Sequence, residues 1–153
     1  MGRWLRAAGH VPDQVLCSTA RRARETWQLA QAGLGAAPPV RFEDLVYQGS
    51  AAQLLDLISS AAPAARTLLI VGHDPAIPDL ARTLAAAAPA ARAGSQGSAG
   101  HRAAADRMRA KFPTAAVAVF EFTGNWDQLS RGMARLTAFV TPRSVAAPAA
   151  NGP

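Results

Sequence analysis

The stretch Thr67-Leu68-Leu69-Ile70-Val71-Gly72-His73-Asp74-Pro75 decides the fold of this chain. Its four apolar residues 68–71 follow one another without alternation, which is typical of a short strand buried on both faces of a parallel sheet. Gly72 lets the backbone turn, and Pro75 prevents the strand from continuing. Ligands of open α/β sheets bind outside the carboxyl ends of strands, so His73 stands where chemistry usually occurs. A hydrogen-bonded histidine in an ordinary strand-to-helix turn explains this stretch alone equally well.

A second buried strand is predicted earlier in the chain, at Val15-Leu16-Cys17. A helix is expected to follow it over residues 20–34, with Ser18 and Thr19 as its caps. Three arginines fall in the first turn and a half of this helix: Arg21, Arg22 and Arg24. Helix N-termini favour acidic side chains because of the macrodipole, so this basic cluster indicates an anion bound nearby.

The rest of the chain continues the alternation of helices and strands. Further helices are expected over residues 2–9, after a capping box formed by Ser50 and Gln53, from Pro78 to Ala88, and over 102–111. Further strands are expected at 40–42, 115–122 and 136–140, the last two as an antiparallel hairpin. The alternation predicts an α/β fold, a three-layer α/β/α sandwich with a mostly parallel sheet. One domain is expected over residues 1–141, with a flexible insert at about 89–100 and a disordered tail over 142–153.

Composition narrows the classes of function. The chain has 153 residues and is 50% hydrophobic, which suits one domain with a sizeable core. It has no run of 18 apolar residues, so no membrane partner is expected. Cys17 is the only cysteine, so no intramolecular disulfide can form and a cytoplasmic location is favoured.

The charge of +6 and the pI near 11.2 invite a nucleic-acid hypothesis. However, the basic residues are almost all arginines scattered from Arg3 to Arg143, and no aromatic residues interleave with the cluster near residue 22. A few arginines suit a small phosphorylated ligand at least as well, so no nucleic-acid partner is expected.

Arg22 and His73, which follow two predicted strands, suit phosphoryl transfer. A guanidinium grips a phosphoryl group with two hydrogen bonds, and an imidazole can donate a hydrogen bond or act as nucleophile or acid. A cysteine phosphatase is the rival, because Cys17 precedes the basic cluster. That signature requires five intervening residues before its arginine, a position that Ala23 holds here. We therefore interpret Cys17 as a small core residue.

The histidines do not predict a metal site. His10, His73 and His101 have neither mutual spacing nor a cysteine or carboxylate pattern to complete a ligand set, and no cofactor is expected. His10 precedes the strand that Arg22 follows, which puts the two on the order of 15 Å apart at opposite ends of the sheet. His101 lies beside the predicted insert and is a weak alternative nucleophile. Glu43 and Asp44 are candidate proton donors, although solvated turn acids are the simpler interpretation.

Several motifs together resemble a known family. Residues 13–26, DQVLCSTARRARET, are similar to the stretch D-x-v-x-x-S-x-x-x-R-A-x-x-T of the histidine phosphatase (phosphoglycerate mutase-like) superfamily. Residues 69–73, LIVGH, resemble its second motif. The spacing, with residues 45–47 and 111–115, is most similar to the small phosphohistidine phosphatase branch, SixA. The resemblance covers roughly residues 1–141.

The resemblance implies a phosphatase that dephosphorylates phosphohistidine or a small phosphomonoester through a phosphohistidine intermediate. Its partner would be a phosphorylated small molecule or a phosphohistidine protein. Arg22 matches the family's phosphate-clamping arginine, and His73 matches its second histidine, which contacts the transferred phosphoryl group.

The chain departs from the family at its start. The family opens with a strand ending in Arg-His-Gly, whose histidine is the nucleophile, whereas this chain begins within the helix that follows. We expect this first strand to be missing between strands 68–71 and 116–122, with a gap or a forced pairing beside Leu69. Either Met1 is not the true start of a longer enzyme, or the chain is an inactive phosphate-binding or regulatory remnant.

Overall fold

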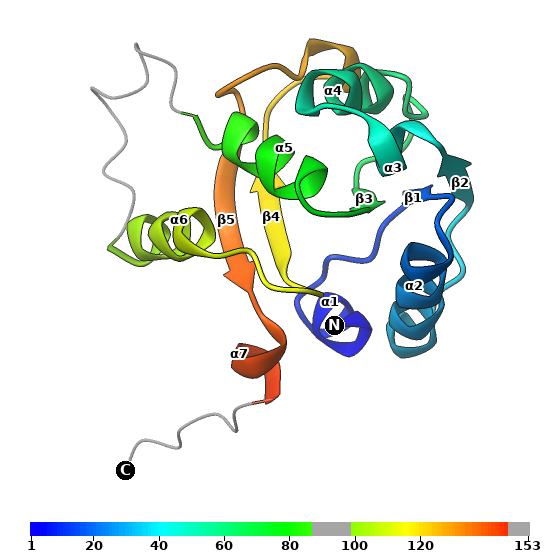
Figure 1. The fold of residues 1–153 in the computed structure, drawn as a ribbon, viewed down its shortest axis with the longest axis horizontal. Coiled ribbons are helices and arrows are strands. Elements are labelled where there is room, and N and C mark those ends of the chain that lie inside the picture. The colour runs from blue at the N-terminus through cyan, green and yellow to red at the C-terminus, as the bar shows by residue number, and fades with distance from the viewer. Residues whose placement is uncertain (87–98, 147–153) are drawn as a thin grey trace.

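Helices and strands alternate along the chain in the computed structural model, which describes residues 1–86 and 99–146 (Figure 1). The strands are β1 (Gln14–Ser18), β2 (Val40–Glu43), β3 (Leu68–Val71), β4 (Val117–Glu121) and β5 (Arg135–Val140). The helices are α1 (Gly2–Ala7), α2 (Arg21–Leu34), α3 (Leu45–Gln48), α4 (Ala51–Ser59), α5 (Ala76–Leu84), α6 (Ala99–Ala110), α7 (Pro142–Ala146) and the 3-10 helix η2 (Trp126–Gln128). This order confirms the predicted α/β class.

The strands form two separate sheets. Three parallel strands lie in the order β2-β1-β3, with Val15 of β1 opposite Val40 and Leu69 of its neighbours. The second sheet pairs β4 with β5 as the predicted antiparallel hairpin. Within the described residues, β3 and β4 each lack a hydrogen-bonded neighbour on one edge. The gap expected beside Leu69 is therefore present.

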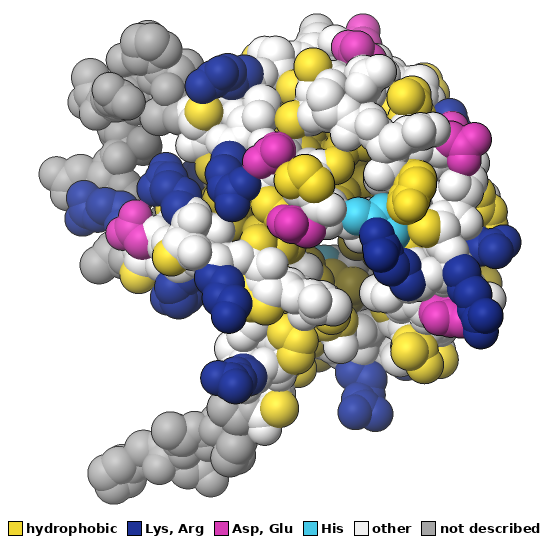
Figure 2. Space-filling model, viewed as in Figure 1, with side chains coloured by type: hydrophobic (Ala, Val, Ile, Leu, Met, Phe, Trp, Pro, Cys, Tyr) yellow, Lys and Arg dark blue, Asp and Glu magenta, His cyan; other side chains and the backbone are white. Residues whose placement is uncertain are grey.

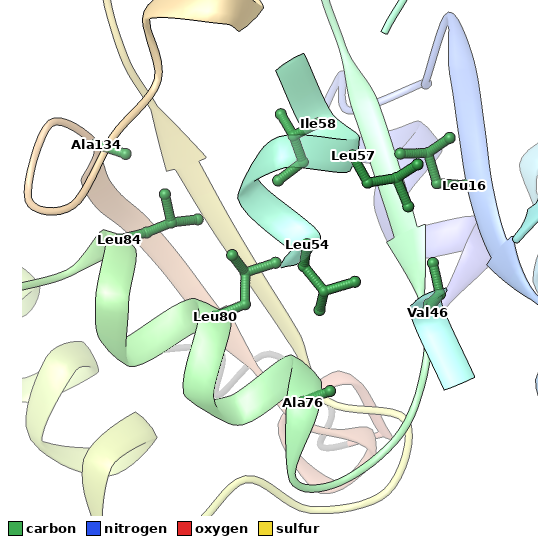
Figure 3. Packing of buried hydrophobic residues seen from close by; sticks show 9 residues of the cluster. All are labelled: Leu16, Val46, Leu54, Leu57, Ile58, Ala76, Leu80, Leu84 and Ala134. Atoms are coloured by element: carbon green, nitrogen blue, oxygen red, sulfur yellow. The ribbon is translucent and has the colours of Figure 1, made fainter. Parts of the chain in front are cut away.

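Helices cover both faces of the parallel sheet. Alternate residues of β1 point to opposite faces, so both faces carry apolar side chains that the helices bury. Val15 and Cys17 pack with Leu5 of α1 and Trp27 of α2. Leu16 points the other way, into a core that helices α3, α4 and α5 complete (Figure 3). Helix α6 packs on β5 of the second sheet. All five residues of β1 are buried, so the sandwich is built around this strand.

Local sequence signals are reproduced in several elements. Ser50 and Gln53 form the predicted capping box of α4. Gly9, with φ of 76°, follows α1 and ends it in the left-handed region that glycine favours. None of the described helices is long and apolar enough to span a bilayer.

Other expectations need correction. The strand expected to be buried on both faces, β3, is only half-buried, because one of its edges faces the gap. Helix α5 ends at Leu84 rather than at residue 88. The first five residues of the expected disordered tail form α7. The remainder of that tail and residues 89–98 of the expected insert lie outside the described residues.

Candidate functional site

Ser18, Arg22 and His73 meet at the carboxyl edge of the parallel sheet. β1 ends at Ser18, and its neighbour β3 ends two residues before His73, with Cys17 opposite Val71. Arg22 lies in the first turn of α2, which follows β1 directly. Nε of Arg22 donates a hydrogen bond of 2.9 Å to Nδ1 of His73, and Nε2 of His73 lies 2.7 Å from Oγ of Ser18. The two residues predicted from separate strands are thus in direct contact.

These contacts determine the protonation of His73. A guanidinium can only donate, so Nδ1 of His73 must accept and carries no proton. Its Nε2–H therefore donates to Oγ of Ser18, and the ring is neutral. Burial and the positive charge of Arg22 lower the pKa of His73 from its ordinary value of 6.5. The protein holds a neutral imidazole directly beside a fixed cation.

Ser18 is a positioning residue. Its side chain is fully buried, and its Oγ also accepts from the backbone N–H of Ala20 at 3.2 Å. This corrects its predicted role as a helix cap, because α2 has Ala20 at its N-cap position and no side-chain cap. A serine-histidine nucleophile is excluded by the same contacts, since the hydroxyl is inaccessible and Nε2 of His73 carries the proton.

Gly72 lets two helices close over the end of β3. A Cβ atom at this position would lie 2.8 Å from Cγ1 of Val46 and 2.8 Å from Cγ1 of Ile77. Gly72 is not among the glycines with positive φ. Its role is close packing beneath His73, rather than the special turn expected from the sequence.

Helix α3 forms the flank of the site. Oγ1 of Thr19 donates a 2.6 Å hydrogen bond to Oδ1 of Asp44, the residue before α3. The ring of Tyr47 meets the ring of His73 edge-on, with 5.2 Å between centroids and 86° between planes. In Figure 2 a histidine is visible on this face beside basic and hydrophobic side chains. The site therefore has an aromatic side as well as a cationic one.

Glu43, the candidate proton donor, is held by an arginine. Its Oε1 accepts from Nε and Nη2 of Arg41 at 3.0 and 2.7 Å, and Arg41 also donates to the backbone oxygen of Ser60. This ion pair favours a structural role for the carboxylate. Proton donation by Glu43 stays a prediction.

Cys17 lies in the core. Its side chain is fully buried, and burial raises the pKa of its thiol to about 11. Because the thiolate is the nucleophilic form, the thiol is inert at neutral pH. The expected core role agrees with this environment, and a cysteine phosphatase is excluded.

Of the other two histidines, only the side chain of His10 is described, and it lies away from the site. His10 packs against Trp4 at the amino end of β1, with 5.7 Å between ring centroids. His101 belongs to α6, and its side chain lies outside the described residues. Across residues 1–86 and 99–146, no group of histidine, cysteine and carboxylate side chains could hold a metal ion.

Two contributors to the site were missed at the sequence level. Ser18 was interpreted as a cap, although it occupies the serine position of the motif quoted above. Tyr47 carried no expected role, and its only signal was its place in the stretch 45–47. The motif threonine, Thr26, donates to the backbone oxygen of Arg22 at 2.8 Å and so steadies the turn that presents it.

A cavity of about 400 Å³ separates β3 from β4. Its lining includes residues 68–70 in one wall and every residue of 116–122 in the other. Successive strand residues point to opposite faces, so a lining of consecutive residues means that the cavity runs along the strand edges. Ile77 and Leu80 of α5 also line it, as does His10. We call this cavity the β3–β4 groove.

Comparison with known proteins places the chain among longer relatives. No protein-family model matches it. It is 37% identical over 142 residues to uncharacterized protein Rv1276c of Mycobacterium tuberculosis (strain ATCC 25618 / H37Rv), covering 93% of this chain and 81% of that protein. Uncharacterized protein ML1117 of Mycobacterium leprae (strain TN) is also 37% identical over 142 residues, with 79% of its length covered.

Two solved structures share the fold. A structure assigned as phosphohistidine phosphatase SixA from Nakamurella multipartitia superposes with a TM-score of 0.75 at 32% identity, over 92% of this chain and 77% of that one. A second SixA assignment, from Agrobacterium tumefaciens, has a TM-score of 0.68 at 21% identity, over 92% and 75% of the two chains, and this likeness concerns the fold alone.

The parallel sheet, its three layers and these neighbours define a fold of the phosphoglycerate mutase-like class. Within that class, the chain belongs to the SixA-like histidine phosphatase family.

Proposed function

We propose that Arg22 and His73 bind a phosphoryl group, and that the protein is a phosphatase acting on phosphohistidine or a small phosphomonoester. The observation that carries this proposal is the direct contact of Arg22 with His73 at the carboxyl edge of the sheet. A phosphoryl oxygen accepts hydrogen bonds from the guanidinium better than a neutral imidazole does. Its negative charge raises the pKa of His73, which then takes up a proton and donates from Nδ1 to the phosphoryl group.

Turnover through a phosphohistidine intermediate needs a second imidazole. Its nitrogen attacks phosphorus while the bond from phosphorus to the leaving group breaks, and the leaving group takes a proton; water then cleaves the new phosphorus–nitrogen bond. His73 is the one histidine that the described side chains bring to the site. The proposal therefore requires a nucleophile from elsewhere.

We infer that an extended segment in the β3–β4 groove supplies this nucleophile. Both walls of the groove are strand edges that pair with no further strand among the described residues, and His73 lies just beyond the end of one wall. A strand placed there would satisfy both edges, and its carboxyl end would reach the level of His73 if it ran parallel to β3. The chain covers 81% of protein Rv1276c and 77% of the structure from Nakamurella multipartitia, so both of these proteins contain residues with no counterpart in the 153-residue chain.

A second candidate function is phosphate binding without turnover, in a regulatory role. It is favoured because Arg22 and His73 are in place, whereas the described side chains bring no second imidazole to the site. In this case a phosphorylated small molecule or phosphohistidine protein binds at Arg22 and His73 and is released unchanged.

One assay separates the two candidates. The 153-residue chain and a version extended by the codons immediately upstream of Met1 in frame are each mixed with phosphoimidazole and with p-nitrophenyl phosphate. We expect background rates from the shorter chain and turnover from the longer one. That turnover should be lost in Arg22→Ala and His73→Ala and retained in Cys17→Ser.

The opposite results are also informative. A stop codon close to Met1, or an extended protein that binds phosphate without turnover, would favour the regulatory function. Turnover by the 153-residue chain that His73→Ala abolishes would show that the nucleophile is already present in this chain.

A further inference from the structure

Helix α3 is clamped beside the Arg22–His73 site. It is a single turn of four residues, which could not hold its shape alone. Thr19 fixes the residue before it through the 2.6 Å hydrogen bond to Asp44. Val46, in its centre, is fully buried and packs where Gly72 leaves room for it. These two anchors fix the backbone on which the next residue, Tyr47, stands.

Tyr47 places an aromatic ring beside His73. Its ring stands edge-on to the imidazole at 5.2 Å, yet 52% of the residue remains exposed. His73 is thus bounded by Ser18 at Nε2, by Arg22 at Nδ1 and by the Tyr47 ring. A half-exposed tyrosine offers a large, rigid apolar surface, and such surfaces bind flat partners at little cost in side-chain entropy.

We propose that Tyr47 is a specificity-determining residue that stacks against the ring of the group carrying the phosphoryl group. The inference rests on the proposed function, because it assumes that phosphoryl oxygens bind at Arg22 and His73. When the phosphoryl group is bound at Arg22 and His73, the rest of the ligand extends either along the ring of Tyr47 or away from it. A planar ring gains contact on the tyrosine, whereas a methyl group is too small to cover it. The site then prefers imidazole or aryl phosphates over alkyl phosphates.

Ligand binding tests this preference without any need for turnover. Inorganic phosphate, methyl phosphate and phenyl phosphate are titrated into the 153-residue protein, and the imidazole resonances of His73 are followed by NMR at constant pH. We expect phenyl phosphate to bind roughly three- to tenfold more tightly than methyl phosphate, the range of an aromatic contact. Tyr47→Leu should reduce this ratio to about one, while Tyr47→Phe, which keeps the ring, should preserve it.

The affinity ratio distinguishes selectivity from structural support. If Tyr47 only held His73 in place, Tyr47→Leu would weaken all three ligands equally and leave the ratio unchanged, which would overturn the inference. Leu29→Ala is the matched control, since Leu29 is 80% exposed on α2 and its loss should change neither affinity nor ratio.

Failure of the inference and failure of the proposed function give different results. Equal binding of methyl and phenyl phosphate by the unmodified protein overturns the inference and leaves the phosphate site intact. If none of the three ligands perturbs His73, the proposed function fails and the inference fails with it. The ratio in the unmodified protein is decisive even if Tyr47→Leu does not fold.

Discussion

The two edges of β3 have opposite character. On one side it pairs with β1, whose residues are all buried and which leads into Ser18 and Arg22. On the other side it borders the β3–β4 groove, where its backbone groups have no partner among the described residues. The part of the candidate site that holds Arg22 and His73 is therefore fixed by the pairing of β1 with β3, while the edge of β3 that borders the groove has no paired strand among the described residues. In the proposed function, phosphate recognition and turnover depend on different parts of this molecule.

The unfinished edge is costly. Each backbone group left without a partner in an apolar setting costs roughly 1 to 3 kcal/mol, against a total stability of about 5 to 15 kcal/mol for a domain. Water entering the groove relieves part of this cost, and a bound strand relieves more of it. An added segment that paired with both edges would therefore stabilise the fold at the groove.

Amide hydrogen exchange should show the largest difference between the two edges. Amides of β1 can exchange only when the sandwich unfolds, whereas amides of β3 and β4 that face the groove exchange from the folded state. We expect protection to differ by roughly 1000-fold or more, equivalent to about 4 kcal/mol. Uniform protection across β1, β3 and β4, measured by NMR, would contradict an open groove.

Arg22→Ala should have the next largest effect, and this effect should be on the binding of phosphate only. A hydrogen bond to a charged group is worth about 1.5 to 3 kcal/mol, so the dissociation constant for inorganic phosphate should rise roughly 10- to 100-fold. Arg21→Ala is the control, because that side chain is 87% exposed and paired with Glu25. Equal losses of affinity in the two variants, measured by calorimetry, would indicate a diffuse basic surface instead of a site.

Gly72→Ala tests how the close packing beneath His73 supports the candidate site. The added methyl group must displace Val46 and Ile77, and such overpacking costs about 1 to 3 kcal/mol of unfolding free energy. Phosphate affinity should fall as well, since His73 is the next residue. Gly9→Ala, which has no neighbour within 4 Å but a φ of 76°, should cost about 1 kcal/mol and leave phosphate binding unchanged. Chemical denaturation with phosphate titration measures both.

The smallest expected effect is a pH dependence of stability due to His73. Its pKa is lowered in the folded protein, so the unfolded chain takes up a proton first as pH falls through 6.5. Stability should therefore decrease below pH 6.5 until the pH passes the lowered pKa, and it should be fully present above 6.5. In His73→Gln this part of the slope should disappear. Denaturation midpoints with the same slope in both proteins would show that His73 does not contribute.

The fold was predictable where local signals agree with packing. The apolar run at 68–71, the capping box at Ser50 and the hairpin near the end of the chain each lie as expected. The half-burial of β3 was not predictable, because burial depends on a neighbouring strand and not on β3 itself. Helix α3 was also missed, since its four residues are held by Thr19 and by Gly72 from distant parts of the chain.

For the site, the sequence located Arg22 and His73 but not their geometry. The carboxyl ends of the strands in a parallel sheet lie at the same edge of that sheet, so the proximity of Arg22 and His73 followed from topology. The direct hydrogen bond between them, the resulting protonation of His73 and the position of Tyr47 depend on side-chain packing. Glu43 was proposed as a proton donor from its residue type alone. Residues two apart in a strand lie on the same face, so its ion pair with Arg41 could equally have been expected.

The central claim, that Arg22 and His73 form a phosphate site, is tested most directly by the ionisation of His73. The ring nitrogen resonances are followed by NMR through a pH titration, with and without inorganic phosphate. Without phosphate we expect a pKa below 6.5 and a proton on Nε2; phosphate should raise the pKa and place a proton on Nδ1. A pKa at or above 6.5 without phosphate, or one that phosphate does not change, would contradict the account.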